Sequence, residues 1–145
     1  MNITPHFTLE DMTHSDNAIR HGIANTASPE IIANLTRLCG VLEKFRSYIG
    51  HPIKVSSGYR NHAVNQLAGS SDTSAHTKGL AADIEVDGIS PKSLCKLFVM
   101  TGLDFDQVIF EGTWMHLGLS EGTQRKEILT AHFSTGQKAT YTRGL

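Results

Sequence analysis

The stretch Ser74-Ala75-His76-Thr77-Lys78-Gly79-Leu80-Ala81-Ala82-Asp83, with the later Trp114-Met115-His116, is the most informative part of this chain. It supplies two imidazoles and one carboxylate, which are suitable zinc ligands. A structural zinc site usually has four protein ligands, whereas a catalytic site has three and leaves one position for water or substrate. The two cysteines, Cys39 and Cys95, lie far apart and form no CxxC pair. A thiolate-rich structural site is therefore excluded, and the pattern indicates hydrolysis.

The same stretch predicts a loop followed by a strand. From Leu80 to Val86 apolar and polar side chains alternate, which places Ala82 and Ile84 on one face and Asp83 on the other. A loop must fold back between His76 and this strand to bring Asp83 inward. Gly79 is suited to that loop because it tolerates positive φ and close backbone approach.

A long helix is the clearest element outside this stretch. Ser28 is a suitable N-cap, Pro29 fits the first helical position, and Gly50 ends the apolar stripe. Strands are expected at 52–56, 107–110 and 114–119, with helices at 61–68 and from 90 to about 102, while 123–145 is weakly patterned and expected to be extended or partly loose.

Length and composition indicate one domain spanning 1–145, and the expected helices and strands indicate an α+β fold. We expect a small, mostly antiparallel sheet with helices packed on one side. The chain has 145 residues, is 39% hydrophobic and carries a net charge of −1, so no nucleic-acid or membrane surface is predicted. No apolar run reaches the roughly 18–20 residues of a membrane span. The cysteines are expected to be buried free thiols, and a monomer is the default expectation.

A candidate general base lies just before His116. If Gly112-Thr113 forms a two-residue type II′ hairpin turn, Glu111 lies opposite Trp114. Glu111 and His116 then project from the same face as diagonal neighbours. In one straight strand they would lie on opposite faces, so this assignment depends on the turn. A carboxylate there could take a proton from a water activated by the metal.

These motifs resemble the zinc D-Ala-D-Ala carboxypeptidase family, peptidase family M15. The resemblance rests on the spacing of Ser74, His76, Gly79, Ala81 and Asp83 with the later Trp114-x-His116, and it runs from about Phe7 to Leu119. The family includes phage L-alanyl-D-glutamate endopeptidases and is related in fold to the hedgehog signalling domain.

The resemblance implies that His76, Asp83 and His116 bind one zinc ion and that Arg60 contacts the substrate or orders the site. In well-known members a glutamate lies three residues before the last histidine ligand, where this chain has Thr113, whereas Glu111 lies five before. Further candidate substrate contacts are Ser74, Tyr59 and Trp114, with packing as the alternative for Tyr59 and Trp114. The metal-site residues, Arg60 and Glu111 could instead be ordinary structural or surface residues.

The leading hypothesis is a zinc peptidase that cleaves peptidoglycan stem peptides, either as a D,D-carboxypeptidase or as an L-Ala-D-Glu endopeptidase. The alternative is a non-catalytic, zinc-stabilised module that binds the cell wall or a partner. No signal peptide is recognisable, so we expect synthesis in the cytoplasm and release to the wall by another factor, as for a phage or prophage lysis protein. An exported bacterial carboxypeptidase is a weaker alternative.

Overall fold

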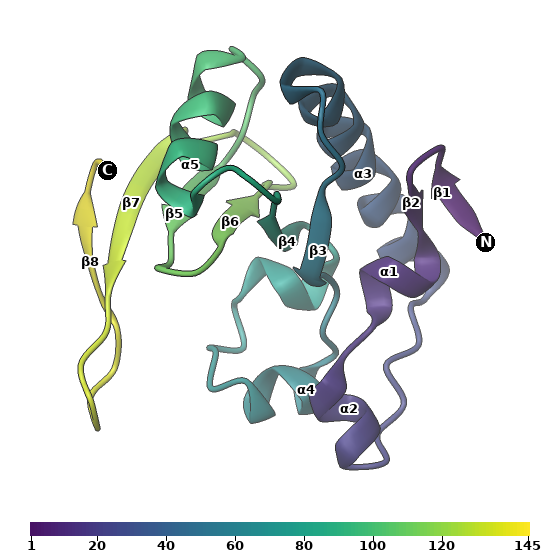
Figure 1. Ribbon diagram of the computed structural model, residues 1–145. Helices are drawn as coiled ribbons and strands as arrows, with labels where there is room; N and C mark the ends of the chain where they lie inside the picture. The colour runs from purple at the N-terminus through teal and green to yellow at the C-terminus, as the bar shows by residue number, and fades with distance from the viewer.

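The computed structural model describes residues 1–145, and it is built around a six-stranded sheet. The strands lie in the order β3-β4-β6-β5-β7-β8, and all neighbours are antiparallel except the parallel pair β5 and β7 (Figure 1). The expected α+β fold with a mostly antiparallel sheet is confirmed. The strand bounds are β3 Lys54–Ser57, β4 Ala81–Glu85, β5 Gln107–Phe110, β6 Met115–Gly118, β7 Glu127–His132 and β8 Thr140–Arg143.

The hydrophobic core lies between one face of this sheet and two helices, α3 (Pro29–Ile49) and α5 (Pro91–Met100). Phe45 of α3 meets Phe98 of α5 edge to face, with ring centroids 5.0 Å apart. Ala82 and Ile84 of β4 belong to the same buried cluster, as the alternation in the sequence predicts. The opposite face of the sheet carries Asp83 and is left for the functional site.

The ends of α3 form as the sequence predicts. The Ser28 side chain accepts a hydrogen bond from the Ile31 backbone N–H at 3.2 Å, and Pro29 takes the first turn. Gly50 ends the helix in the left-handed region at φ +69°. The expected strand at 52–56 begins two residues later, at Lys54. Pro52 has no N–H to donate to a strand ladder, which accounts for the later start.

The remaining short elements lie below β3 and to the right of β3 and α3 in Figure 1. None of the helices combines the length and apolar character that a membrane span requires. These elements are β1 Asn2–Thr4, β2 Phe7–Thr8, α1 Leu9–Thr13, α2 Asp16–Arg20, α4 His62–Leu67 and the 3₁₀ helix η1 Ala75–Lys78.

The C-terminal stretch forms a β hairpin that widens the sheet. β7 pairs with β5, β8 forms the free edge, and the hairpin projects away from α3 and α5 in Figure 1. The Gly144 N–H donates to the Ile128 carbonyl at 2.8 Å and ties the chain end to β7. The weakly patterned region therefore contributes two strands to the same sheet.

Candidate active site

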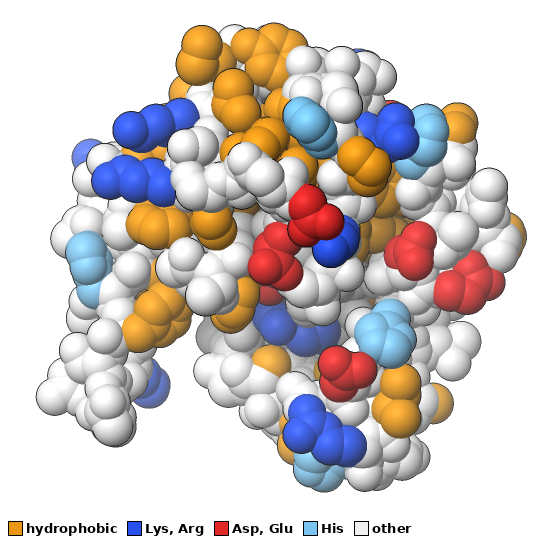
Figure 2. Space-filling model, viewed as in Figure 1, with side chains coloured by type: hydrophobic (Ala, Val, Ile, Leu, Met, Phe, Trp, Pro, Cys, Tyr) orange, Lys and Arg blue, Asp and Glu red, His pale blue; other side chains and the backbone are white.

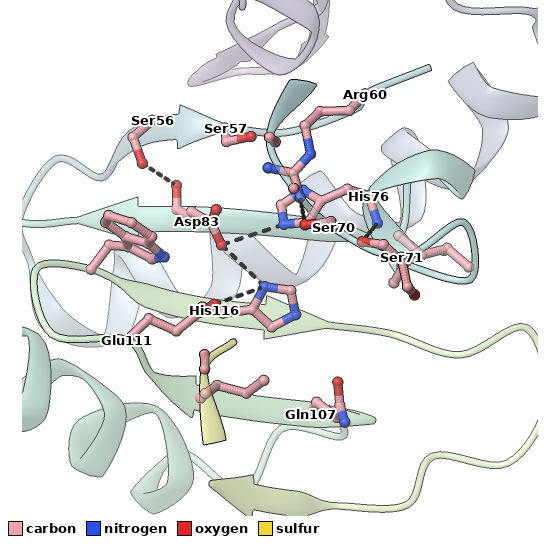
Figure 3. Close-up of a pocket in the computed structure, with 18 of the residues that line it drawn as sticks. Ser56, Ser57, Arg60, Ser70, Ser71, His76, Asp83, Gln107, Glu111 and His116 are labelled. Atoms are coloured by element: carbon pink, nitrogen blue, oxygen red, sulfur yellow. Dashed lines mark hydrogen bonds and ion pairs between the residues drawn. The ribbon is translucent and has the colours of Figure 1, made fainter. Parts of the chain in front are cut away.

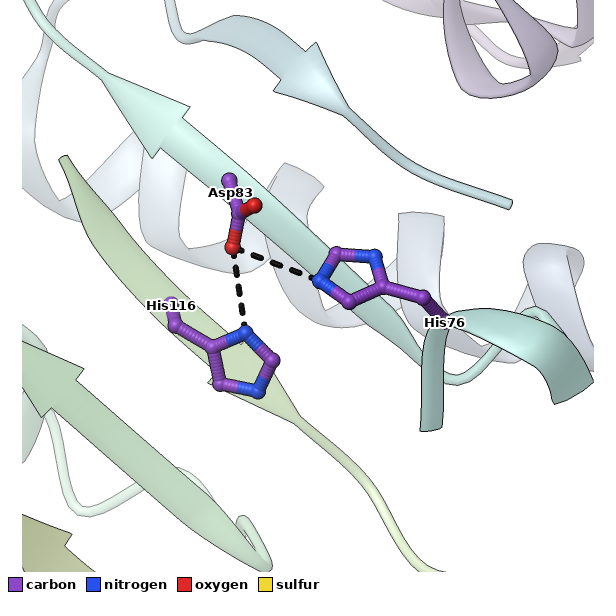
Figure 4. Close-up of side chains that lie close together, drawn as sticks. All are labelled: His76, Asp83 and His116. Atoms are coloured by element: carbon purple, nitrogen blue, oxygen red, sulfur yellow. Dashed lines mark hydrogen bonds and ion pairs between the residues drawn. The ribbon is translucent and has the colours of Figure 1, made fainter. Parts of the chain in front are cut away.

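Three buried side chains from three elements converge on one point (Figure 4). His76 comes from η1, Asp83 from β4 and His116 from β6, where Asp83 and His116 lie directly opposite each other. Asp83 Oδ1 lies 3.0 Å from His116 Nδ1 and 3.4 Å from His76 Nε2. The three ligand atoms lie within 4.8 Å of one another. The sequence therefore identified a group that the fold brings together.

The spacing of these atoms fits a single zinc ion. Ligands at about 2.0–2.1 Å from a tetrahedral ion lie roughly 3.3 Å from one another. The separations of 3.0 and 3.4 Å around Asp83 Oδ1 are close to that value. Two imidazole nitrogens and one carboxylate oxygen are also ligands that zinc accepts, and three protein ligands leave a position for another group.

The orientation of His76 is fixed by a backbone carbonyl. Its Nδ1 lies 2.7 Å from the Gly58 carbonyl oxygen, which can only accept a hydrogen bond, so Nδ1 must donate. The lone pair of the neutral ring is therefore on Nε2, the atom that faces Asp83. Burial lowers the pKa of His76, which keeps the ring neutral and ready to bind a metal.

The two other ligands are linked electrostatically. Burial opposes ionisation of Asp83, but hydrogen bonds from His116 and His76 outweigh it and hold the Asp83 pKa well below its usual range. Burial likewise opposes a charge on His116, yet Asp83 and Glu111 together raise the His116 pKa. The pocket is therefore strongly favourable for a positive charge beside Asp83, as a metal site requires.

Glu111 lies beside this group because of a tight turn. Gly112 has φ +82°, and the Thr113 N–H donates to the Glu111 carbonyl at 3.0 Å, an i to i+2 closure. The turn is thus narrower than the expected II′ turn, but the Glu111 N–H still pairs with the Trp114 carbonyl at 3.1 Å. Glu111 Oε1 lies 3.5 Å from His116 Nδ1, so the two side chains share one face as the hairpin interpretation predicts.

The environment of Glu111 suits proton transfer. Burial is the largest influence and raises the Glu111 pKa, and the charge of Asp83 adds to this. His116, Trp114 and Arg60 act in the opposite direction without cancelling the rise. A carboxyl group whose pKa moves toward neutrality can both accept and return a proton near neutral pH.

Arg60 extends into the site from the other side of the cleft. Figure 3 shows its guanidinium directed toward His76 and Asp83. One terminal nitrogen donates to Ser70 Oγ at 3.2 Å, while Nε is buried without a hydrogen-bond partner. Burial lowers the Arg60 pKa, although the charges of Asp83 and Glu111 oppose this. Arg60 lines the cleft, where its guanidinium could bind an anionic group.

The other sequence-predicted contacts fall into two groups. Ser74 and Trp114 line the cleft, where Ser74 also caps η1 and Trp114 has a buried indole N–H without a partner. Tyr59 does not line the cleft. It is 8% exposed and belongs to the hydrophobic core, so the packing interpretation fits it and the substrate-contact interpretation does not.

The metal site opens into a large cleft of about 1560 Å³. One wall comes from α2, the end of β3 and the loop before η1, and the other comes from the β7–β8 hairpin. Figure 2 shows the hollow between the projecting hairpin and the lobe that contains α2 and α4. Sequence reasoning missed Gly58, Ser70 and this second wall, because none of them belongs to a motif with metal-binding or catalytic side chains.

Comparison with known proteins identifies a family to which this chain is similar, but no individual curated protein. No curated protein matches the chain significantly. A family model described as Peptidase M15 matches residues 5–117, which include all three candidate metal ligands and Glu111. Because that match covers most of the chain, this protein belongs to the peptidase M15 family.

Proposed function

We propose that this protein is a zinc peptidase that hydrolyses peptide bonds in peptidoglycan stem peptides. Family membership suggests a zinc metallopeptidase acting on peptidoglycan, and the site geometry supports that assignment. The observation that carries the proposal is the buried His76, Asp83 and His116 group with Glu111 Oε1 3.5 Å from His116, all facing an open cleft. A site that only stabilised the fold would not need this fourth side chain or a route for a long substrate.

His76, Asp83 and His116 would hold the ion. When bound, zinc supplies a Lewis acid that polarises the scissile carbonyl and makes water easier to deprotonate. Glu111 accepts the proton of the attacking water and returns it to the nitrogen of the leaving amine. Arg60 offers its guanidinium to a substrate carboxylate or to the oxygen that gains negative charge.

The test is mass spectrometry of peptidoglycan after incubation with the protein, with and without a chelator. Loss of a terminal alanine would identify a carboxypeptidase, and cleavage after the first alanine of the stem would identify an L-Ala-D-Glu endopeptidase. Glu111→Gln should retain zinc and lose about 10²–10⁴-fold in kcat, the usual contribution of a general base. His76→Ala and His116→Ala should lose both zinc and cleavage.

His62→Ala is the matched control, because His62 is exposed on α4 and does not line the cleft. It should retain zinc and full activity. Full activity in Glu111→Gln would show that Glu111 is not the general base. If zinc-loaded protein gave no product from peptidoglycans of different stem chemistry, the peptidase proposal would fail in favour of a zinc-stabilised binding module.

A further inference from the structure

The metal-binding face of the sheet continues directly into the C-terminal hairpin. The strand register places His116 opposite Ile109, and Ile109 opposite Leu129 of β7. Directly opposed residues share one face of a sheet, so all three point into the same cleft. Ile109 is only 7% exposed yet does not belong to the core cluster, and both Ile109 and Leu129 line the cleft. They form an apolar floor that begins at the metal site.

Two exposed aromatic side chains stand beside this floor. Phe133 follows β7 and is 60% exposed, and Tyr141 lies on β8 and is 51% exposed. A Cβ built on Gly112 would lie 4.0 Å from Phe133 Cε2, which places the ring against the turn that carries Glu111. Partial burial and the charge of Glu111 both raise the pKa of Tyr141, so its phenol also lies near that carboxylate.

Contiguous apolar surface that lies exposed in a cleft is typical of a binding site. Both rings line the cleft and do not cover the core, so their packing does not stabilise the fold. The hairpin also lies beyond residue 117, where the family match ends. This wall is therefore built from a part of the chain that the shared family region does not include.

We propose that Phe133 and Tyr141 determine substrate specificity by holding a residue of the peptide, next to the two residues that the scissile bond joins, against the Ile109 and Leu129 floor. The inference rests on the proposed peptidase function and deepens it. That residue has an apolar side chain, because the floor and the two rings are apolar, and it lies outside the pair of residues that the cleaved bond joins. Lys138 also lines this wall and forms no ion pair within the protein. It can therefore form an ion pair with a carboxylate of the same peptide.

The experiment compares Phe133→Ser/Tyr141→Ser with Tyr48→Ser/Met100→Ser. Tyr48 of α3 and Met100 of α5 are 51% and 71% exposed. They are therefore about as exposed as Phe133 and Tyr141, but they lie on the helix side of the sheet, away from the cleft. The substrates are a free stem peptide that extends on both sides of the cleaved bond and a dipeptide that contains only that bond. Both double variants should melt like the unmodified protein, since all four side chains are exposed.

The hairpin variant should lose about tenfold in kcat/KM on the long peptide and nothing on the dipeptide, because only the long peptide reaches the rings. The control variant should be unchanged on both. The hairpin variant should also bind the long peptide about tenfold more weakly. Isothermal titration calorimetry measures this in zinc-loaded protein that also carries Glu111→Gln, so that the peptide is not cut. Amidating the peptide carboxylate should weaken binding to the protein but not to its Lys138→Ala variant.

Two results would overturn the inference. One is a hairpin variant that cuts and binds the long peptide as well as the control. The other is a loss confined to intact peptidoglycan with free peptides unaffected, which would mean that the rings contact glycan. If the unmodified protein cut neither peptide, the proposed function would fail, while the binding measurement would still decide the role of the hairpin.

Discussion

At the scale of single residues, the metal site depends on a glycine as much as on its charged side chains. The Gly58 carbonyl fixes His76, and the next residue, Tyr59, donates its N–H to the Met12 carbonyl at 2.7 Å. A Cβ on Gly58 would lie 2.4 Å from that same Met12 oxygen. The backbone that aims His76 can therefore approach α1 only because residue 58 has no side chain.

This geometry predicts that Gly58→Ala weakens zinc binding without touching a ligand. The new methyl group must push Met12 and residue 58 apart, which moves the carbonyl that holds His76. We expect a loss of about 1–3 kcal/mol in stability and of about 10–100-fold in zinc affinity. Competition with a chromogenic chelator measures the affinity, and urea unfolding measures the stability.

Gly40→Ala provides the matched control, because a Cβ at Gly40 in α3 meets nothing within 4 Å. It should leave zinc affinity unchanged and raise stability by up to about 1 kcal/mol, since alanine favours a helix more than glycine does. Unchanged zinc affinity in Gly58→Ala would show that the carbonyl does not position His76.

At the scale of elements, the parallel pairing of β5 with β7 carries the hairpin to the cleft, and one ion pair reinforces it. Asp106, just before β5, accepts two hydrogen bonds from the Arg125 guanidinium, at 3.0 and 2.8 Å. It also accepts one from the Arg125 backbone N–H at 3.0 Å. Arg125 precedes β7, so this contact fixes where the parallel strand begins.

Asp106→Asn should therefore destabilise the protein by about 1 kcal/mol at neutral pH, a modest value because Arg125 is exposed. The Arg125 hydrogen bonds lower the Asp106 pKa in the folded state. A lowered carboxyl pKa stabilises the fold above the unfolded value of about 3.9, and this stabilisation disappears as the pH falls through the folded value. The difference between the variant and the parent should thus be full at pH 6 and shrink progressively as the pH falls below about 4.

Urea unfolding across that pH range is the measurement, with Lys54→Met as the control. Lys54 forms an exposed ion pair with Asp87 at 3.0 Å at the other edge of the sheet and should change stability very little. A difference between Asp106→Asn and the parent that did not depend on pH would mean that the charge of Asp106 contributes nothing.

The elements also differ in how far the sequence could predict them. The bounds of α3 follow from local signals, because Ser28, Pro29 and Gly50 act on neighbouring residues. The face of β4 that carries Asp83 likewise follows from alternation. The partner of β7 does not, since a parallel pairing with β5 joins segments separated by another strand. The wall that this pairing builds was therefore missed, although the sequence predicted that Glu111, His76, Asp83 and His116 lie close together.

At the scale of the whole molecule, the candidate metal site joins three elements, η1, β4 and β6, that come from separate parts of the chain. η1 leads out of the loop that forms one wall of the cleft, and β4 and β6 are central strands. A ligand that binds only the folded chain stabilises it by RT ln(1 + [L]/Kd). Zinc held by these three elements should therefore stabilise the domain as well as supply its chemistry.

Zinc at about 100 times its Kd should add about 2.7 kcal/mol, which corresponds to a rise of about 5–10 °C in Tm for a chain of this size. Differential scanning calorimetry of chelated and zinc-loaded protein measures the shift. His76→Ala should lose most of it because one ligand is missing, whereas the exposed His62→Ala should keep it in full. An equal shift in His76→Ala would place the zinc elsewhere, and the assignment of His76, Asp83 and His116 as the metal site would fall with it.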